Sequence, residues 1–218
     1  VYEKGVDLYY GKTNFHNRVK INYDDRSDFN KAKFAAATSD IVIMVLGEEG
    51  NQSGEGRSRT NIGLPGLQLE LLKEIRKINN NIVLVVMSGR PLDLSWEDEN
   101  IPAIVQAWHL GSKSGDAIAQ VLYGDYNPSG KLTMSFPRNV GQVPIYYNFK
   151  NTGRPSTSIQ QVTNSGYADV ENSPLYSFGY GLSYTNFSYS DFSIDSDKLE
   201  FNSKINVSVK LENTGYYK

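Results

Sequence analysis

The chain has 218 residues and a formal net charge of −2 at pH 7, from 22 basic and 24 acidic residues. This length exceeds a typical domain of about 100 to 150 residues, so we expect one domain plus part of another. The balanced charge gives no reason to expect a nucleic acid or a membrane as partner, and the lack of cysteine excludes disulfides, thiolate nucleophiles and cysteine-bound metals.

The first half of the chain alternates patterns typical of helices and strands. The apolar runs at 41–46 and 82–87 have the length of fully buried strands, and a third strand is expected at 103–108. Helices are expected at 31–38, from Pro65 through Ile78 with Leu67, Leu71 and Ile75 on one face, and at 114–123. This order predicts an α/β fold, with a largely parallel sheet flanked by helices on both faces.

The second half of the chain has a different character. Residues 146–174 are polar, and alternation at 186–195 and 204–211 has the period of half-buried strands. We therefore expect an α/β sandwich domain over 1–145, a long connecting segment over 146–184, and the truncated start of a β-sandwich over 185–218. The chain starts at Val1 without methionine, and both ends are expected to be cut from a longer protein.

The loop at 47–57 carries three carboxylates directly after the first predicted strand. Ligands of open α/β sheets bind outside the carboxyl ends of the strands, so this loop is a candidate site. We select Glu55 as a candidate general acid/base, although a solvated surface glutamate fits the same pattern. Glu48 and Glu49 lie nearer the strand, where bonding to loop N–H groups and bracing the loop is the favoured interpretation.

Other site classes find little support. The acidic loop lacks the Gly-Lys-Ser/Thr ending of a phosphate-binding loop, and no cofactor is expected. Asp125, Asn127 and Ser129 resemble the start of a calcium loop, but Phe136 stands where its bidentate glutamate belongs, so a structural turn is favoured.

The histidines and tryptophans are few. His16 and His109 are too isolated for a metal site, and no metal is expected. Trp96 and Trp108 could each stack on a sugar, although Trp108 reads better as a core residue. Substrate-binding residues remain unassigned.

Short motifs across nearly the whole chain, in a fixed order, resemble the glycoside hydrolase family 3 β-glucosidases and β-xylosidases. They are Lys4-Gly5, Gly47-Glu48, Glu55-Gly56 with Ser58-Arg59-Thr60, Leu64-Pro65 with Gln68, Ser88-Gly89-Arg90-Pro91, Gly124 to Leu132, Ser135 to Arg138, Asn151 to Pro155 and Phe178 to Tyr184. After Trp108 the chain departs from the glycine-rich turn or proline that the family often has, so no sugar contacts are carried over from that turn.

The resemblance implies a retaining β-glycosidase that hydrolyses terminal β-D-glucosides. An N-terminal barrel outside this chain would carry an aspartate nucleophile, this α/β sandwich domain would supply Glu55 as acid/base, and the last strands would open a fibronectin-type-III-like domain. The implied partners are a β-linked glucoside or oligosaccharide and that barrel, and the implied location is periplasmic or secreted. Alone, the chain is expected to be inactive.

Two other classes remain open. A non-catalytic carbohydrate-binding or scaffold module would use the tryptophans and many tyrosines, although their spacing makes no obvious platform. A flavodoxin-like cofactor or signalling domain ranks last.

Overall fold

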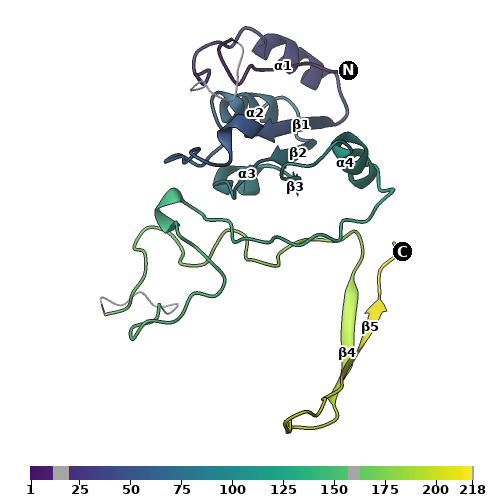
Figure 1. Cartoon of the computed structure of the whole chain (residues 1–218). Helices are drawn as coiled ribbons and strands as arrows, with labels where there is room; N and C mark the ends of the chain where they lie inside the picture. The colour runs from purple at the N-terminus through teal and green to yellow at the C-terminus, as the bar shows by residue number, and fades with distance from the viewer. Residues whose placement is uncertain (12–19, 157–162, 218) are drawn as a thin grey trace. The chain divides into compact units, whose positions relative to one another are not determined.

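The structure is a computed structural model that describes residues 1–11, 20–156 and 163–217 (Figure 1). The chain divides into two compact units. Val1–Ser112 and Leu132–Gly179 form the first unit, and Lys113–Lys131 and Tyr180–Lys218 form the second. A parallel sheet with its helices belongs to the first unit, and an antiparallel ribbon belongs to the second.

The parallel sheet has the strand order β1-β2-β3, with β1 at Val42–Gly47, β2 at Ile82–Met87 and β3 at Ala103–Gln106. The central strand β2 is the most deeply buried of the three, and four of its six residues are buried. Its continuous apolar sequence suits a strand covered on both faces. The predicted α/β class, with a parallel sheet and flanking helices followed by antiparallel strands, is confirmed.

Three α-helices accompany the sheet in the described part of the first unit: α1 at Phe29–Ala37, α2 at Gln68–Arg76 and α3 at Ser95–Asn100. Helix α2 packs against β1 and α1 and buries Leu71, Leu72 and Ile75. These residues recur at helical spacing on one face, so burying that face holds the helix on the sheet. Short 3₁₀ turns lie at η1, Gly50–Gln52, and η2, Val140–Gln142.

The predicted bounds of α2 were wrong at both ends. Pro65 does not occupy the first helical turn, because the helix starts three residues later at Gln68. Ile78 lies beyond the last helical residue and is 40% exposed. The apolar period continues through the turns on either side of the helix, so periodicity alone overestimates its length.

The prediction of a fully buried strand at 41–46 was also wrong. Met44 is buried, but Ile43 and Val45 are 44% and 54% exposed. In the described part of the sheet β1 is an edge strand that pairs only with β2. An unbroken apolar run shows that both faces of a strand favour burial, but it cannot show what covers each face.

The second unit contains α4, Ser114–Leu122, and an antiparallel pair formed by β4, Phe187–Ile194, and β5, Val207–Asn213. All residues of β4 and β5 are exposed, so the prediction of half-buried strands was wrong about burial. The alternating apolar residues are present, but no described element covers either face of the ribbon.

The segment with Asp125, Asn127 and Ser129, which resembles the start of a calcium loop, forms a turn that bonds to the main chain near Tyr184. Asn127 Oδ1 accepts hydrogen bonds from Ser183 Oγ at 3.1 Å and from the Tyr184 backbone N–H at 2.8 Å. The turn therefore joins two distant segments within the second unit.

Helices long and apolar enough to cross a membrane do not occur among the described residues.

Candidate functional site

The candidate site is the edge of the parallel sheet where loops leave the carboxyl ends of β1 and β2. Gly47 ends β1 with a φ of 138°, and a Cβ atom there would lie 1.8 Å from the Met87 carbonyl oxygen. The next residue, Glu48, donates its backbone N–H to that same oxygen at 2.8 Å. Only glycine combines this backbone angle with so close an approach, so the acidic loop starts pressed against the end of β2.

Gln68, at the start of α2, holds the end of β1. Its Oε1 accepts from the Gly47 N–H at 2.7 Å, and its Nε2 donates to the Gly47 carbonyl at 2.9 Å and to the Pro65 carbonyl at 3.0 Å. These buried bonds replace the strand pairing that ends at this point. The root of the loop is therefore fixed by a strand and by a helix.

Glu48 is a buried anion at the centre of the loop. Its side chain has no exposed area, and it accepts hydrogen bonds from Arg59 Nη1 at 2.6 Å, Ser53 Oγ at 2.8 Å and Arg90 Nε at 3.1 Å. Burial would raise the pKa of this carboxyl, but the hydrogen bonds from Arg59, Ser53 and Arg90 outweigh it and hold the pKa below its ordinary value. Glu48 is thus an ionised structural anchor.

Glu49 braces the next part of the loop. Its carboxylate accepts from the Asn51 backbone N–H at 2.9 Å and from the Tyr9 hydroxyl at 3.0 Å, and it caps the 3₁₀ turn η1. Burial, and then the bond to Glu49, raises the pKa of Tyr9. The predicted bonding to loop N–H groups is confirmed for Glu49, whereas Glu48 braces the loop through side chains.

Glu55 lies at the exposed tip of the same loop. Gly54 and Gly56 flank it with φ angles of 107° and 68°, and space around both glycines is open. None of the described residues forms a hydrogen bond or an ion pair with the Glu55 carboxylate. Glu48 and Glu49 are therefore held by hydrogen bonds within the loop, whereas the Glu55 side chain is exposed.

Arg90 connects the second loop to the first. It follows β2 in the Ser88-Gly89-Arg90-Pro91 segment, and its Nη2 donates to the carbonyl oxygens of Gln52, at 2.5 Å, and of Arg57, at 2.7 Å. Sequence reasoning assigned no role to Arg59 or Arg90. The position of Arg90 just after the strand beside β1 was the available signal, because parallel strands end at the same edge.

The remaining candidates lie apart from this cluster or are occupied by other contacts. Trp108 packs against Phe136, with ring centroids 5.7 Å apart, as the core interpretation predicted. His109 is exposed, and His16 lies outside the described residues. In the described ranges, no three histidine or acidic side chains gather to hold a metal ion.

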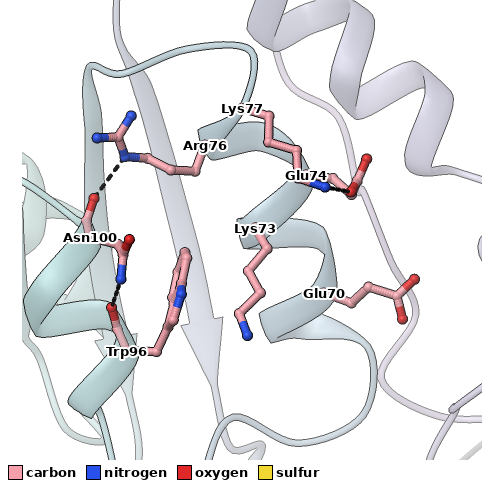
Figure 2. A pocket seen from close by; sticks show the side chains of 7 residues that line it. All are labelled: Glu70, Lys73, Glu74, Arg76, Lys77, Trp96 and Asn100. Atoms are coloured by element: carbon pink, nitrogen blue, oxygen red, sulfur yellow. Dashed lines mark hydrogen bonds and ion pairs between the residues drawn. The ribbon is translucent and has the colours of Figure 1, made fainter.

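A surface pocket of about 420 Å³ lies between α2 and α3. Figure 2 shows Lys73 directed toward Trp96, and Lys73 Nζ lies 5.0 Å from the Trp96 ring centroid. The cation therefore competes with a sugar for that side of the ring. The pocket is lined by Glu70, Lys73, Glu74, Arg76, Lys77, Trp96 and Asn100.

Comparison with known proteins places this geometry in context. Residues 4–184 match the Glycosyl hydrolase family 3 C-terminal domain. The chain is 43% identical over 223 residues to a periplasmic beta-glucosidase of Salmonella typhimurium, covering 99% of this chain and 29% of the relative. It is 41% identical to a beta-xylosidase of Formosa agariphila, covering 90% of this chain and 28% of that protein.

The fold of solved structures agrees with these matches. A beta-glucosidase from Listeria innocua in complex with glucose superposes with a TM-score of 0.82 at 35% identity, covering 90% of this chain and 27% of that one. The chain thus spans less than a third of the length of the relatives that it matches.

Proposed function

Because the chain belongs to glycoside hydrolase family 3 and contains its C-terminal domain, we propose that it is part of a retaining β-glycosidase that removes terminal β-D-glucosyl residues, with Glu55 as general acid/base. The observation that carries the assignment is the outward-facing Glu55 carboxylate on a loop whose other two glutamates are held by internal bonds.

The geometry of the loop supports this division of roles. A general acid/base must reach the reacting oxygen of another molecule, which the bonded carboxylates of Glu48 and Glu49 cannot do without breaking their contacts. Among the residues that the structure describes, none holds the Glu55 carboxylate by such a contact. The relatives named as β-glucosidases, and the Listeria innocua protein in complex with glucose, favour a glucoside as substrate.

In the proposed mechanism, Glu55 performs two proton transfers. It protonates the departing glycosidic oxygen while a carboxylate nucleophile from another domain attacks the anomeric carbon. It then takes a proton from the water that hydrolyses the glycosyl-enzyme. Retaining enzymes hold the two carboxyl groups about 5 to 5.5 Å apart. We propose that the nucleophile comes from a barrel domain of the whole protein, and that this protein is periplasmic or secreted, as the name of the Salmonella relative suggests.

The first prediction concerns Glu55→Ala in the full-length enzyme. Without the acid, kcat/KM for cellobiose should fall by about 10²- to 10⁴-fold. The value of kcat/KM for 2,4-dinitrophenyl β-glucoside should change little, because its leaving group needs no proton. Azide should raise kcat on the activated substrate and yield β-glucosyl azide, because azide needs no base. Steady-state kinetics and product analysis measure both effects.

Glu49→Gln is the comparison within the same loop, and Glu99→Ala, on the exposed side of α3, controls for loss of a surface carboxylate. Equal losses on both substrates for Glu55→Ala would contradict the acid/base role. A selective loss with azide rescue in Glu49→Gln instead would move that role to Glu49.

No observation favours a carbohydrate-binding module. Lys73 Nζ lies over the Trp96 ring, and Trp108 packs against Phe136, so both tryptophans are already engaged in contacts within the chain.

A further inference from the structure

The loop that carries Glu55 is anchored on both sides of that residue by the side chain of Arg90, which lies in the loop after β2. Arg90 Nη2 donates to the Gln52 carbonyl, three residues before Glu55, and to the Arg57 carbonyl, two residues after it. A single nitrogen thus closes the base of a short excursion of the main chain. The two glycines beside Glu55 would otherwise leave this excursion wide conformational freedom.

Arg90 is itself fixed in place. Its Nε lies 3.0 Å from Glu48 Oε1, and Glu48 is fully buried and also bonded by Arg59 and Ser53. The Arg90 carbonyl accepts from Ser88 Oγ at 2.9 Å, which ties the backbone of the second loop to itself. The guanidinium group therefore bonds a buried anion through Nε and the two loop carbonyls through Nη2.

The two loops also meet without spare room. A Cβ atom on Gly89 would lie 2.5 Å from both Cβ and Oγ of Ser53, so glycine is required for this close approach. Ser53 in turn donates to Glu48. Packing and hydrogen bonding thus hold the start of the excursion against the loop that carries Arg90.

We propose that Arg90, held by Glu48, is a positioning residue that fixes the main chain on both sides of Glu55 and so sets the direction in which the Glu55 carboxylate reaches the glycosidic oxygen. This inference rests on the proposed function of Glu55. Arg90 contacts no reacting atom itself. It acts by reducing the set of conformations that the 53–57 segment can adopt. The Glu55 carboxyl is then held near its reactive position before the substrate binds.

We call the bonds from Arg90 to Glu48 and to the Gln52 and Arg57 carbonyls the clamp. Arg90→Lys in the full-length enzyme tests it. Lysine keeps a positive charge for Glu48, but its single ammonium group cannot hold Glu48 and both carbonyls in the geometry of the planar guanidinium. We expect kcat/KM for cellobiose to fall by roughly 10- to 100-fold while kcat/KM for 2,4-dinitrophenyl β-glucoside stays within about threefold. Arg26→Lys is the matched control, because Arg26 makes an exposed two-point bond to Glu70 away from this loop.

The double variant Arg90→Lys/Glu55→Gln separates positioning from general damage. If Arg90 acts through Glu55, the double variant should lose no more activity on cellobiose than Glu55→Gln alone. Losses that multiply, or an Arg90→Lys loss that is equal on both substrates, would overturn the clamp while leaving the Glu55 assignment intact. A Glu55→Gln variant without a selective loss would overturn the proposed function and the clamp with it.

A milder variant keeps the test decisive if Arg90→Lys does not fold. Ser53→Ala removes one hydrogen bond from Glu48 and leaves both arginines in place. It should show the same preference for activated substrates, with a loss of about threefold on cellobiose. Equal losses on the two substrates in Ser53→Ala would overturn the proposal.

Discussion

At the scale of single residues, two buried glutamates behave in opposite ways. Glu48 is surrounded by two arginines and a serine and stays ionised. Glu97, on α3, is only 2% exposed, and its Oε1 has no hydrogen-bond partner among the described residues. Burial therefore raises the pKa of Glu97 to about 7. The difference between them comes from the neighbours, since both carboxyls are removed from water.

The raised pKa makes Glu97 a source of pH-dependent stability. Between the ordinary pKa of glutamate and pH 7 the unfolded chain releases this proton and the folded chain keeps it, so the free energy of unfolding falls as pH rises. The loss attributable to Glu97 should reach about 3 kcal/mol and level off above pH 7.

Glu97→Gln should remove this pH dependence and be more stable than the parent at pH 8, because a neutral amide stays uncharged in the same buried position. Urea unfolding at several pH values measures the effect, with the exposed neighbour Glu99→Gln as control. A parallel pH profile in the parent and in Glu97→Gln would contradict the assignment.

At the scale of elements, the central strand and the terminal ribbon should differ most in stability. Strand β2 is mostly buried and paired on both sides, whereas in the described part of the chain β4 and β5 pair only with each other and all their residues are exposed. An isolated two-stranded ribbon is marginally stable in water. In the chain alone, amide protons of β4 and β5 should exchange on the order of 10³-fold faster than those of β2. Hydrogen exchange measured by mass spectrometry checks this, and equal protection would show that something covers the ribbon.

The sequence predicted some elements well because their local signal matched their final environment. Strand β2 has the predicted bounds, 82–87, since six consecutive apolar residues fill a position covered on both faces. Helix α3 was missed, because Ser95–Asn100 is short and mostly polar, and its burial of Glu97 depends on tertiary contacts. The exposure of Ile43 and Val45 likewise depends on the neighbours of β1, which its own residues do not encode.

The candidate site was predictable only in part for a similar reason. The acidic loop and Glu55 could be selected because they follow a predicted strand within one continuous segment. The clamp joins Arg90 to Gln52 and Arg57, which lie more than 30 positions earlier in the sequence. A pattern within one segment carries no information about such partners, and the resemblance supplied motifs without their contacts.

At the scale of the whole molecule, the proposed chemistry divides one active site between separate parts of a protein. The chain covers 29% of the Salmonella relative, and we propose that the nucleophile lies elsewhere in the full-length enzyme. The purified chain should therefore hydrolyse 4-nitrophenyl β-glucoside no faster than buffer, because the covalent step lacks its carboxylate. Turnover that Glu55→Gln abolishes would contradict this division.

The close approach of Gly89 to Ser53 has a mechanical consequence. With no gap between them, the loop after β1 cannot shift sideways unless the loop after β2 shifts too. A sugar in contact with Glu55 would thus displace the loop after β1 only if the loop after β2 moved as well. The remaining movement would be concentrated at Gly54 and Gly56 and in the Glu55 side chain between them.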